Sequence, residues 1–216
     1  MKQPSLRERK KIAAMHTIQE AAVNLFERDG FDAVTIDQVA AEADVSPSTV
    51  YRYFGTKEGL VLHDELDDGA IELFITRVAA GEDPAVAMRA TLTEVLGEHF
   101  HPADEDLTRR RTLLWMGTPA IRRAGLELFD DVVEQVAVAL SEVTDADRQQ
   151  SRLAVSVTLW PLMAAIRNWH EDGARVDGWF EHLQRALAVA PQTIPGWPGS
   201  SPSQPPTPQP GRDAAS

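Results

Sequence analysis

Residues 35–57 read TIDQVAAEADVSPSTVYRYFGTK, and this segment contains the start signals of two short helices. Thr35 with Gln38 three residues later is typical of a capping box, which predicts a helix that ends near Asp44. Ser46 followed by Pro47 favours a second start, because serine caps a helix and proline fits its first position. Two short helices at 35–43 and 46–54, joined by a tight turn, form a helix-turn-helix.

The second of these helices can have the two faces that a DNA-reading helix needs. Val50 and Phe54 are four residues apart and can both point inward against the preceding helices. The other face must then carry small or polar side chains that can reach base edges in the major groove. The residues that we expect on this outer face are Ser46, Pro47, Ser48, Thr49, Tyr51 and Arg52.

The rest of the chain also carries helix signals, and no segment alternates in the way that a strand does. A helix from about residue 7 to 29 should bury one apolar stripe. Its members are Met15, Ile18, Ala22, Leu25 and Phe26. Further helices are expected at about 57–79, 83–100, 103–116, 118–143, 145–170 with a kink at Pro161, and 177–190. The fold class is therefore all-α, with about nine helices.

The first 62 residues resemble the DNA-binding head of the TetR family of bacterial transcription regulators. The resemblance covers about residues 12–62 and rests on motifs at fixed offsets. These are the run from Ile18 to Phe26, the pairs Gly30-Phe31 and Thr35-Ile36, the Tyr51-x-Tyr53-Phe54 motif and the Gly55-Thr56-Lys57-Glu58 motif. They imply a head at 1–62 and a helical ligand-binding and dimerisation body at 63–190.

The same resemblance implies a role for individual residues of the head. Ser46, Pro47, Ser48 and Tyr51 would read bases, and Arg52 would reach a base or a phosphate. Thr35, Tyr53 and Lys57 would each bind a phosphate. Four basic residues before the first apolar stripe, Arg7, Arg9, Lys10 and Lys11, would reach the DNA backbone or the minor groove. Each residue also has a structural alternative: Thr35 can be a helix cap, Tyr53 a core aromatic and Lys57 a solvated charge.

The charge distribution agrees with a head that faces DNA. The net charge is −12, yet all four lysines lie in residues 1–62, where the net charge is only −1. Residues 63–190 have 12 basic and 23 acidic residues, so that phosphates would repel this part of the chain.

The resemblance implies an apolar effector pocket in the body and a dimer interface made by its last two helices, at 145–170 and 177–190. The candidate pocket residues are Met88, Leu92, Leu96, Phe100, Trp115, Met116, Phe129 and Trp160. These side chains can equally be core residues. The run Arg109-Arg110-Arg111 can hold an acidic effector, although a solvated face opposite Asp104, Glu105 and Asp106 is the better interpretation.

Other function classes have little support. There is no cysteine, and neither His99 with His101 nor His170 has zinc-site spacing, so we expect no metal site and no cofactor. We find no catalytic motif, signal peptide or membrane span, and we expect a cytoplasmic protein. Residues 191–216 contain eight prolines and are expected to form a disordered tail.

Taken together, the head, its resemblance and the charge distribution predict a repressor that binds palindromic operator DNA as a dimer and is released by a small-molecule effector. The alternatives are a ligand-independent or activating regulator and, last, a helical enzyme.

Overall fold

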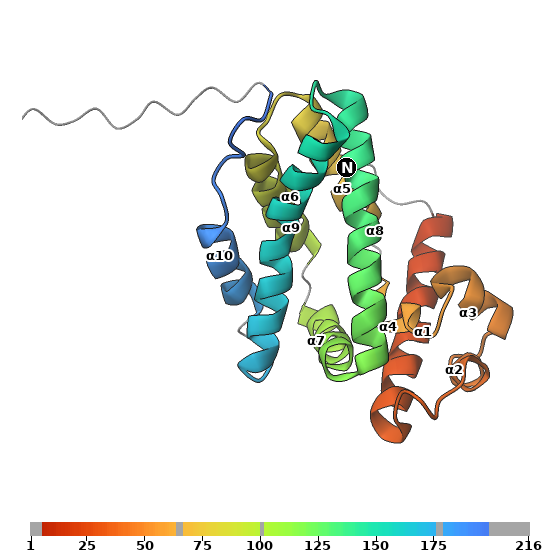
Figure 1. Cartoon of the computed structure of the whole chain (residues 1–216). Helices are drawn as coiled ribbons and strands as arrows, with labels where there is room; N and C mark the ends of the chain where they lie inside the picture. The colour runs from red at the N-terminus through yellow and green to blue at the C-terminus, as the bar shows by residue number, and fades with distance from the viewer. Residues whose placement is uncertain (1–5, 64–66, 100–101, 176–178, 199–216) are drawn as a thin grey trace, which may run out of the picture.

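The computed structural model describes residues 6–63, 67–99, 102–175 and 179–198, and every regular element in these ranges is an α-helix (Figure 1). The all-α prediction is confirmed, with ten helices in these ranges where about nine were expected. They are α1 (Leu6–Asp29), α2 (Ile36–Glu42), α3 (Pro47–Phe54), α4 (Gly59–Leu62), α5 (Asp67–Ala79), α6 (Pro84–His99), α7 (Pro102–Gly117), α8 (Pro119–Val143), α9 (Arg148–Glu171) and α10 (Trp179–Val189). None of these helices is long and apolar enough to cross a membrane.

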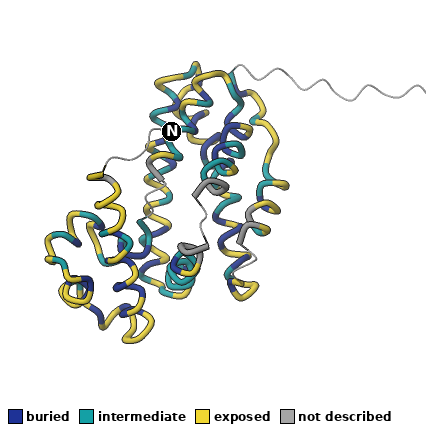
Figure 2. The backbone as a smooth tube through the Cα atoms, turned by 180° about the vertical axis from the view of Figure 1, so that it is seen from behind, coloured by how far each residue is buried: buried dark blue, intermediate teal, exposed yellow. Residues whose placement is uncertain are grey.

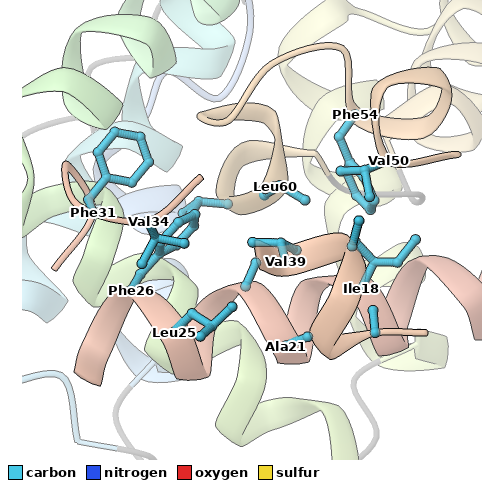
Figure 3. Packing of buried hydrophobic residues seen from close by; sticks show 14 of the residues in the cluster. Ile18, Ala21, Leu25, Phe26, Phe31, Val34, Val39, Val50, Phe54 and Leu60 are labelled. Atoms are coloured by element: carbon cyan, nitrogen blue, oxygen red, sulfur yellow. The ribbon is translucent and has the colours of Figure 1, made fainter. Parts of the chain in front are cut away.

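Helices α1 to α4 pack around one apolar core (Figure 3). The whole stripe predicted for the first helix, from Met15 to Phe26, is buried in α1. Val39 of α2, Val50 and Phe54 of α3, and Leu60 of α4 close over it. Burial of these side chains fixes α3 against α1 and α2 with its other face free.

The head core does not end at residue 62. Ile121 of α8 is fully buried in the same cluster, and Leu114 and Trp115 of α7 pack against it. Gly125 of α8 makes this approach possible, because a Cβ at that position would overlap the Trp115 ring. Head and body therefore share side chains across the boundary expected at 62.

The single helix expected at 57–79 is two helices in the structure. α4 ends at Leu62, and His63 has an extended backbone with ψ of 126°. Arg111 of α7 donates to the carbonyl oxygens of Val61 (2.8 Å) and His63, and Gln19 of α1 also donates to His63. These side chains satisfy carbonyls that a continuing helix would have used, so the chain can leave the helix here.

The body is built from α5 to α10, with α8 and α9 packed along each other (Figure 1). Its main core cluster draws side chains from α5, α6, α8 and α9, such as Phe74, Met88, Val136 and Val155. α9 runs from Arg148 to Glu171 as one helix with Pro161 inside it. Smaller clusters join α7 to α9 and α9 to α10.

The packed chain extends beyond α10, where the sequence predicted that the body ends at 190. Residues 191–198 lie against the body, and Trp197 is 6% exposed within the main core cluster. Ile194 and Trp197, two large apolar residues among prolines, are the sequence signal that could have indicated this docking. Residues 199–216 of the expected tail lie outside the described ranges.

Candidate nucleic-acid interface

The turn between α2 and α3 depends on one residue in the left-handed region. Asp44 has a φ of 52°, and its amide donates to the carbonyl of Ala41 (3.3 Å). The next amide, that of Val45, donates to the carbonyl of Ala40 (2.9 Å). Aspartate tolerates this conformation better than most residues, and the two hydrogen bonds close the end of α2. The turn lies where the sequence predicts it, whereas the left-handed conformation of Asp44 was not predicted.

Serine and threonine hydroxyls organise the start of α3. The Ser46 Oγ accepts from the Thr49 amide (3.3 Å) and lies 2.9 Å from the hydroxyls of both Ser48 and Thr49. Pro47 takes the first helical position, as predicted. The result is a capped helix start with three hydroxyls close together, which agrees with the expected local structure.

Helix α3 divides into the two faces that its sequence predicts. Val50 and Phe54 are buried, whereas Ser46, Pro47, Ser48 and Arg52 are exposed and Thr49 is half-buried. Tyr51 is 54% exposed, so a partner can reach its ring from solvent. The outer surface of α2 and α3 is largely exposed in the view from behind (Figure 2). The face of α3 that is expected to read DNA is therefore open to solvent.

The residues expected to bind phosphates flank this face. Thr35 caps α2 in a full capping box with Gln38, and its side chain is exposed. Tyr53 is half-buried, and the Arg52 guanidinium lies 4.8 Å from the centre of its ring. Both residues also have the structural role named as their alternative. Thr35 is a helix cap, and Tyr53 packs on the head core.

Lys57 has a clear role inside the head. Its ammonium donates to the carbonyl oxygens of Phe31 (2.7 Å) and Val34 (3.0 Å), and it lies 4.3 Å from the centre of the Phe31 ring. These contacts tie the end of α3 to the loop between α1 and α2. Lys57 therefore has a structural role as well, and its phosphate contact stays a prediction.

The four basic residues at the start of the chain lie on α1. Arg7, Arg9, Lys10 and Lys11 are helical and exposed, so they form a charged helix surface instead of an extended arm. Residues 1–5 lie outside the described ranges.

Comparison with known proteins bears on the whole chain. It is 32% identical over 196 residues to the HTH-type transcriptional regulator TcmR of Streptomyces glaucescens, which covers 87% of this chain and 85% of TcmR. The family model for bacterial regulatory proteins of the tetR family matches residues 18–63. The chain belongs to the TetR family. It is accordingly a DNA-binding transcriptional regulator, and the helix-turn-helix is the TetR-family head.

Other similarities are shorter or more distant. The HTH-type transcriptional regulator HbdR of Aromatoleum sp. (strain CIB) is 44% identical over 46 residues, which is 21% of this chain and 20% of HbdR. The crystal structure of NalD, the secondary repressor of the MexAB-OprM multidrug efflux pump in Pseudomonas aeruginosa, aligns with a TM-score of 0.46 at 17% identity. That alignment covers 86% of this chain and 98% of NalD.

The residues expected to line an effector pocket in this TetR-family body lie in different places. Met88, Leu92 and Phe129 belong to the main core cluster. Trp115 and Met116 belong to the cluster that joins α7 to α9, and Phe129 also packs against this cluster. Trp160 is half exposed with its ring 5.1 Å from that of Phe129, and the side chains of Leu96 and Phe100 lie outside the described residues. This set stays a prediction.

Two cavities of the body have described linings. One of about 250 Å³ opens between α9 and α10 and has polar walls that include Asn168, Asp172 and His182. The other, of about 10 Å³, has Met88 in its lining and is the one that involves an expected effector residue.

The arginine run on α7 contacts the head, so the predicted solvated face is wrong for Arg110 and Arg111. Arg110 donates to both carboxylate oxygens of Glu27 (2.5–3.1 Å) and to the side-chain oxygen of Asn24 (2.6 Å), both on α1. The Glu27 hydrogen bonds raise the pKa of Arg110. Arg111 caps α4, as described above, and Arg109 pairs with Asp106 within α7. No local pattern in the sequence shows that two of these arginines reach a helix more than 40 residues away.

Proposed function

We propose that this TetR-family regulator is a repressor that binds a palindromic operator as a homodimer and is released by a small-molecule effector. The proposal that the protein reads DNA rests on the free outer face of α3. Tyr51 is exposed on this face, while Val50 and Phe54 on the opposite face are buried and fix the helix in the head. Small hydroxyl residues and a tyrosine at the start of such a helix suit contacts with base edges and phosphates. The strongly acidic body favours an approach to DNA through the head alone.

The proposal of a homodimer is supported by the outer face of α9. Leu153, Val157 and Trp160 are spaced by four and three residues, and they are 60%, 41% and 51% exposed. α10 packs through Ala186 on Ala165 of α9 within the same subunit. The exposed apolar residues Leu153, Val157 and Trp160 of α9 are the candidate surface for a partner. Two heads are also needed for affinity, since one half-site offers few base contacts.

The proposal of effector release is supported by the junction between α7 and the head. Arg110 and Arg111 fasten α7 to α1 and α4, and α7 also contributes Met116 to the body core. An effector that moves α7 would therefore move α4 and the head with it. A coupling free energy of about 1–3 kcal/mol is sufficient for induction.

Operator binding tests the proposal directly. Fluorescence anisotropy would be measured on the duplex upstream of the protein's own gene and on a scrambled duplex, at about 50 to 200 mM salt. We expect two subunits per site, preference for the native duplex and steep loss of affinity with salt. Equal, weak binding to both duplexes would speak against an operator at this position.

Two variants separate base reading from phosphate binding. Tyr51→Ala should cost about 1–3 kcal/mol on the operator and leave binding to the scrambled duplex unchanged. Arg9→Ala should weaken both duplexes equally and lower the salt slope by about one. A Tyr51→Ala protein that binds the operator like the parent would show that α3 is not the reading helix.

Transcription from the promoter upstream of the protein's own gene distinguishes a repressor from an activator. A repressor should lower this transcription, and an activator should raise it.

A further inference from the structure

The end of α7 and the start of α8, which we term the α7–α8 corner (residues 114–125), are built into the core of the head. Ile121, in the first turn of α8, is fully buried among side chains of the head. Leu114 and Trp115 of α7 pack on the same cluster. Figure 1 shows this end of α8 beside α1 and α4. Because side chains of the body complete the head core, the angle between head and body depends on how α7 and α8 pack at the corner.

Trp115 belongs to two packed regions at once. Its ring packs on the head core, and it also packs on the cluster of Met116, Met163 and Ile166 that joins α7 to α9. A movement of α7 against α8 would therefore change the contacts of this one side chain with the head and with the body together.

Gly125 of α8 is the surface against which the Trp115 ring rests. Gly125 is buried, and a Cβ at this position would overlap the Nε1 atom of Trp115 and lie 2.7 Å from its Cε2 atom. Glycine inside a helix is otherwise unfavourable, since alanine stabilises a helix by comparison. The glycine is therefore explained by the close contact, and a larger residue would push the ring and α7 away from α8.

Shape alone holds the indole N–H of Trp115 in this contact. Among the described residues, the buried Nε1 atom has no hydrogen-bond partner. A buried donor without a partner costs free energy, which the protein would regain if α7 moved and the N–H met water or an acceptor. Packing of the ring on the two clusters offsets this cost. The docked contact is thus balanced against an undocked one, as a joint with two positions requires.

We propose that Trp115 and Gly125 form the joint that positions the head for operator reading, and that the docked joint is the operator-binding state. In a dimer, two copies of α3 must enter successive major grooves, about 34 Å apart. A change of angle at each joint alters the distance between the two α3 helices, so base reading is lost while each head can still contact phosphates. This inference rests on the proposed function for the dimer and adds the residues that set the angle of the head.

Fluorescence anisotropy of the full chain with Gly125→Ala, on the operator duplex and on the scrambled duplex, tests the proposal. The variant should bind the operator at least about fivefold more weakly than the parent, because the added Cβ displaces the Trp115 ring. Binding to the scrambled duplex should not change, since every duplex offers phosphates to the heads. Gly117→Ala is the matched control. Gly117 ends α7 with open space around it, so both affinities should equal those of the parent.

The two duplexes separate a positioning role from damage to the fold. A folded, dimeric Gly125→Ala protein with the operator affinity of the parent would overturn the proposal. An equal loss of affinity on both duplexes would also overturn it, because the head itself would then be impaired. A parent chain without preference for the operator would contradict the proposed function and, with it, the joint. The joint alone fails if the parent prefers the operator and Gly125→Ala does so equally.

A compensating pair of substitutions applies if Gly125→Ala does not fold. Trp115→Leu removes the Nε1, Cε2 and Cζ2 atoms that a Cβ at position 125 would meet. By itself it should lower the preference for the operator, because the shorter side chain leaves space between α7 and α8. Adding Gly125→Ala to Trp115→Leu should bring the preference closer to that of the parent, since the new methyl group fills part of this space. Parental preference in Trp115→Leu, or no gain in the double variant, would overturn the proposal.

Discussion

Lys57 shows how a single residue of the head can serve both the fold and the expected DNA contact. Its ammonium holds two backbone carbonyls and lies over the Phe31 ring. Hydrogen bonds of a charged group contribute about 1.5–3 kcal/mol each. Replacing Lys57 would thus disturb the head as well as any phosphate contact, which is why Arg9, exposed on α1, is the better probe of DNA binding.

The absence of a side chain matters at Gly59, the first residue of α4. A Cβ there would overlap the carbonyl oxygen of Phe54, which is backbone and has little freedom to move. We expect Gly59→Ala to destabilise the protein by about 1–3 kcal/mol, measured by urea denaturation. Gly69→Ala is the control, because open space surrounds that position in α5, and it should stabilise by about 0.5–1 kcal/mol. Equal effects at both positions would contradict the steric explanation.

At the scale of the helices, α7 is the element that joins body and head. Arg111→Met should remove the donor that caps α4 and cost about 1–3 kcal/mol of unfolding free energy, because the Val61 carbonyl loses its partner. Arg123→Met on the exposed side of α8 is the matched control and should change stability by less than about 0.5 kcal/mol. Urea denaturation would measure both, and similar values for the two variants would refute the capping role.

Helices α8 and α9 are tied by Glu134, which accepts hydrogen bonds from Arg152 and from Arg148 (3.0 Å). These hydrogen bonds lower the pKa of Glu134 from 4.5 to about 2. A lowered folded-state pKa stabilises the protein above pH 4.5, and this contribution is lost as the pH falls from 4.5 towards 2. Glu134→Gln should therefore be less stable than the parent at neutral pH, by a small amount because the pair is exposed.

Thermal unfolding of parent and Glu134→Gln across this pH range measures the effect. The difference in melting temperature should be constant above about pH 5 and should shrink below it. A difference that does not depend on pH would assign the effect to packing and not to the charge of Glu134.

For the molecule as a whole, the exposed apolar face of α9 predicts a dimer. Val157→Glu places a charge in the centre of the apolar face of α9 and should convert a dimer into a monomer with greatly weakened operator binding. Val86→Glu is the control, since Val86 is exposed to a similar degree on α6, away from that face. Sedimentation velocity would measure both variants. A Val157→Glu protein that remains dimeric would place the interface elsewhere.

The amino-acid sequence by itself determined where most helices begin and which residues of α1 and α3 are buried. The Thr35–Gln38 capping box, the Ser46–Pro47 start and the stripe from Met15 to Phe26 all appear as predicted. Capping and helical periodicity act between residues about three or four positions apart, so a linear sequence contains them in full.

Only the tertiary structure decided the features that join distant residues. The break at His63 depends on Arg111, 48 residues later. The segment 191–198 is held to the body by a hydrogen bond between the Ile194 amide and Asp83, 111 residues apart. The sequence also did not distinguish Trp197, which is buried, from Trp160, which is exposed on α9. Contacts between residues far apart in the sequence depend on how whole helices pack. Whether a side chain is buried depends on the shape of the element that packs against it, which the local sequence pattern does not contain.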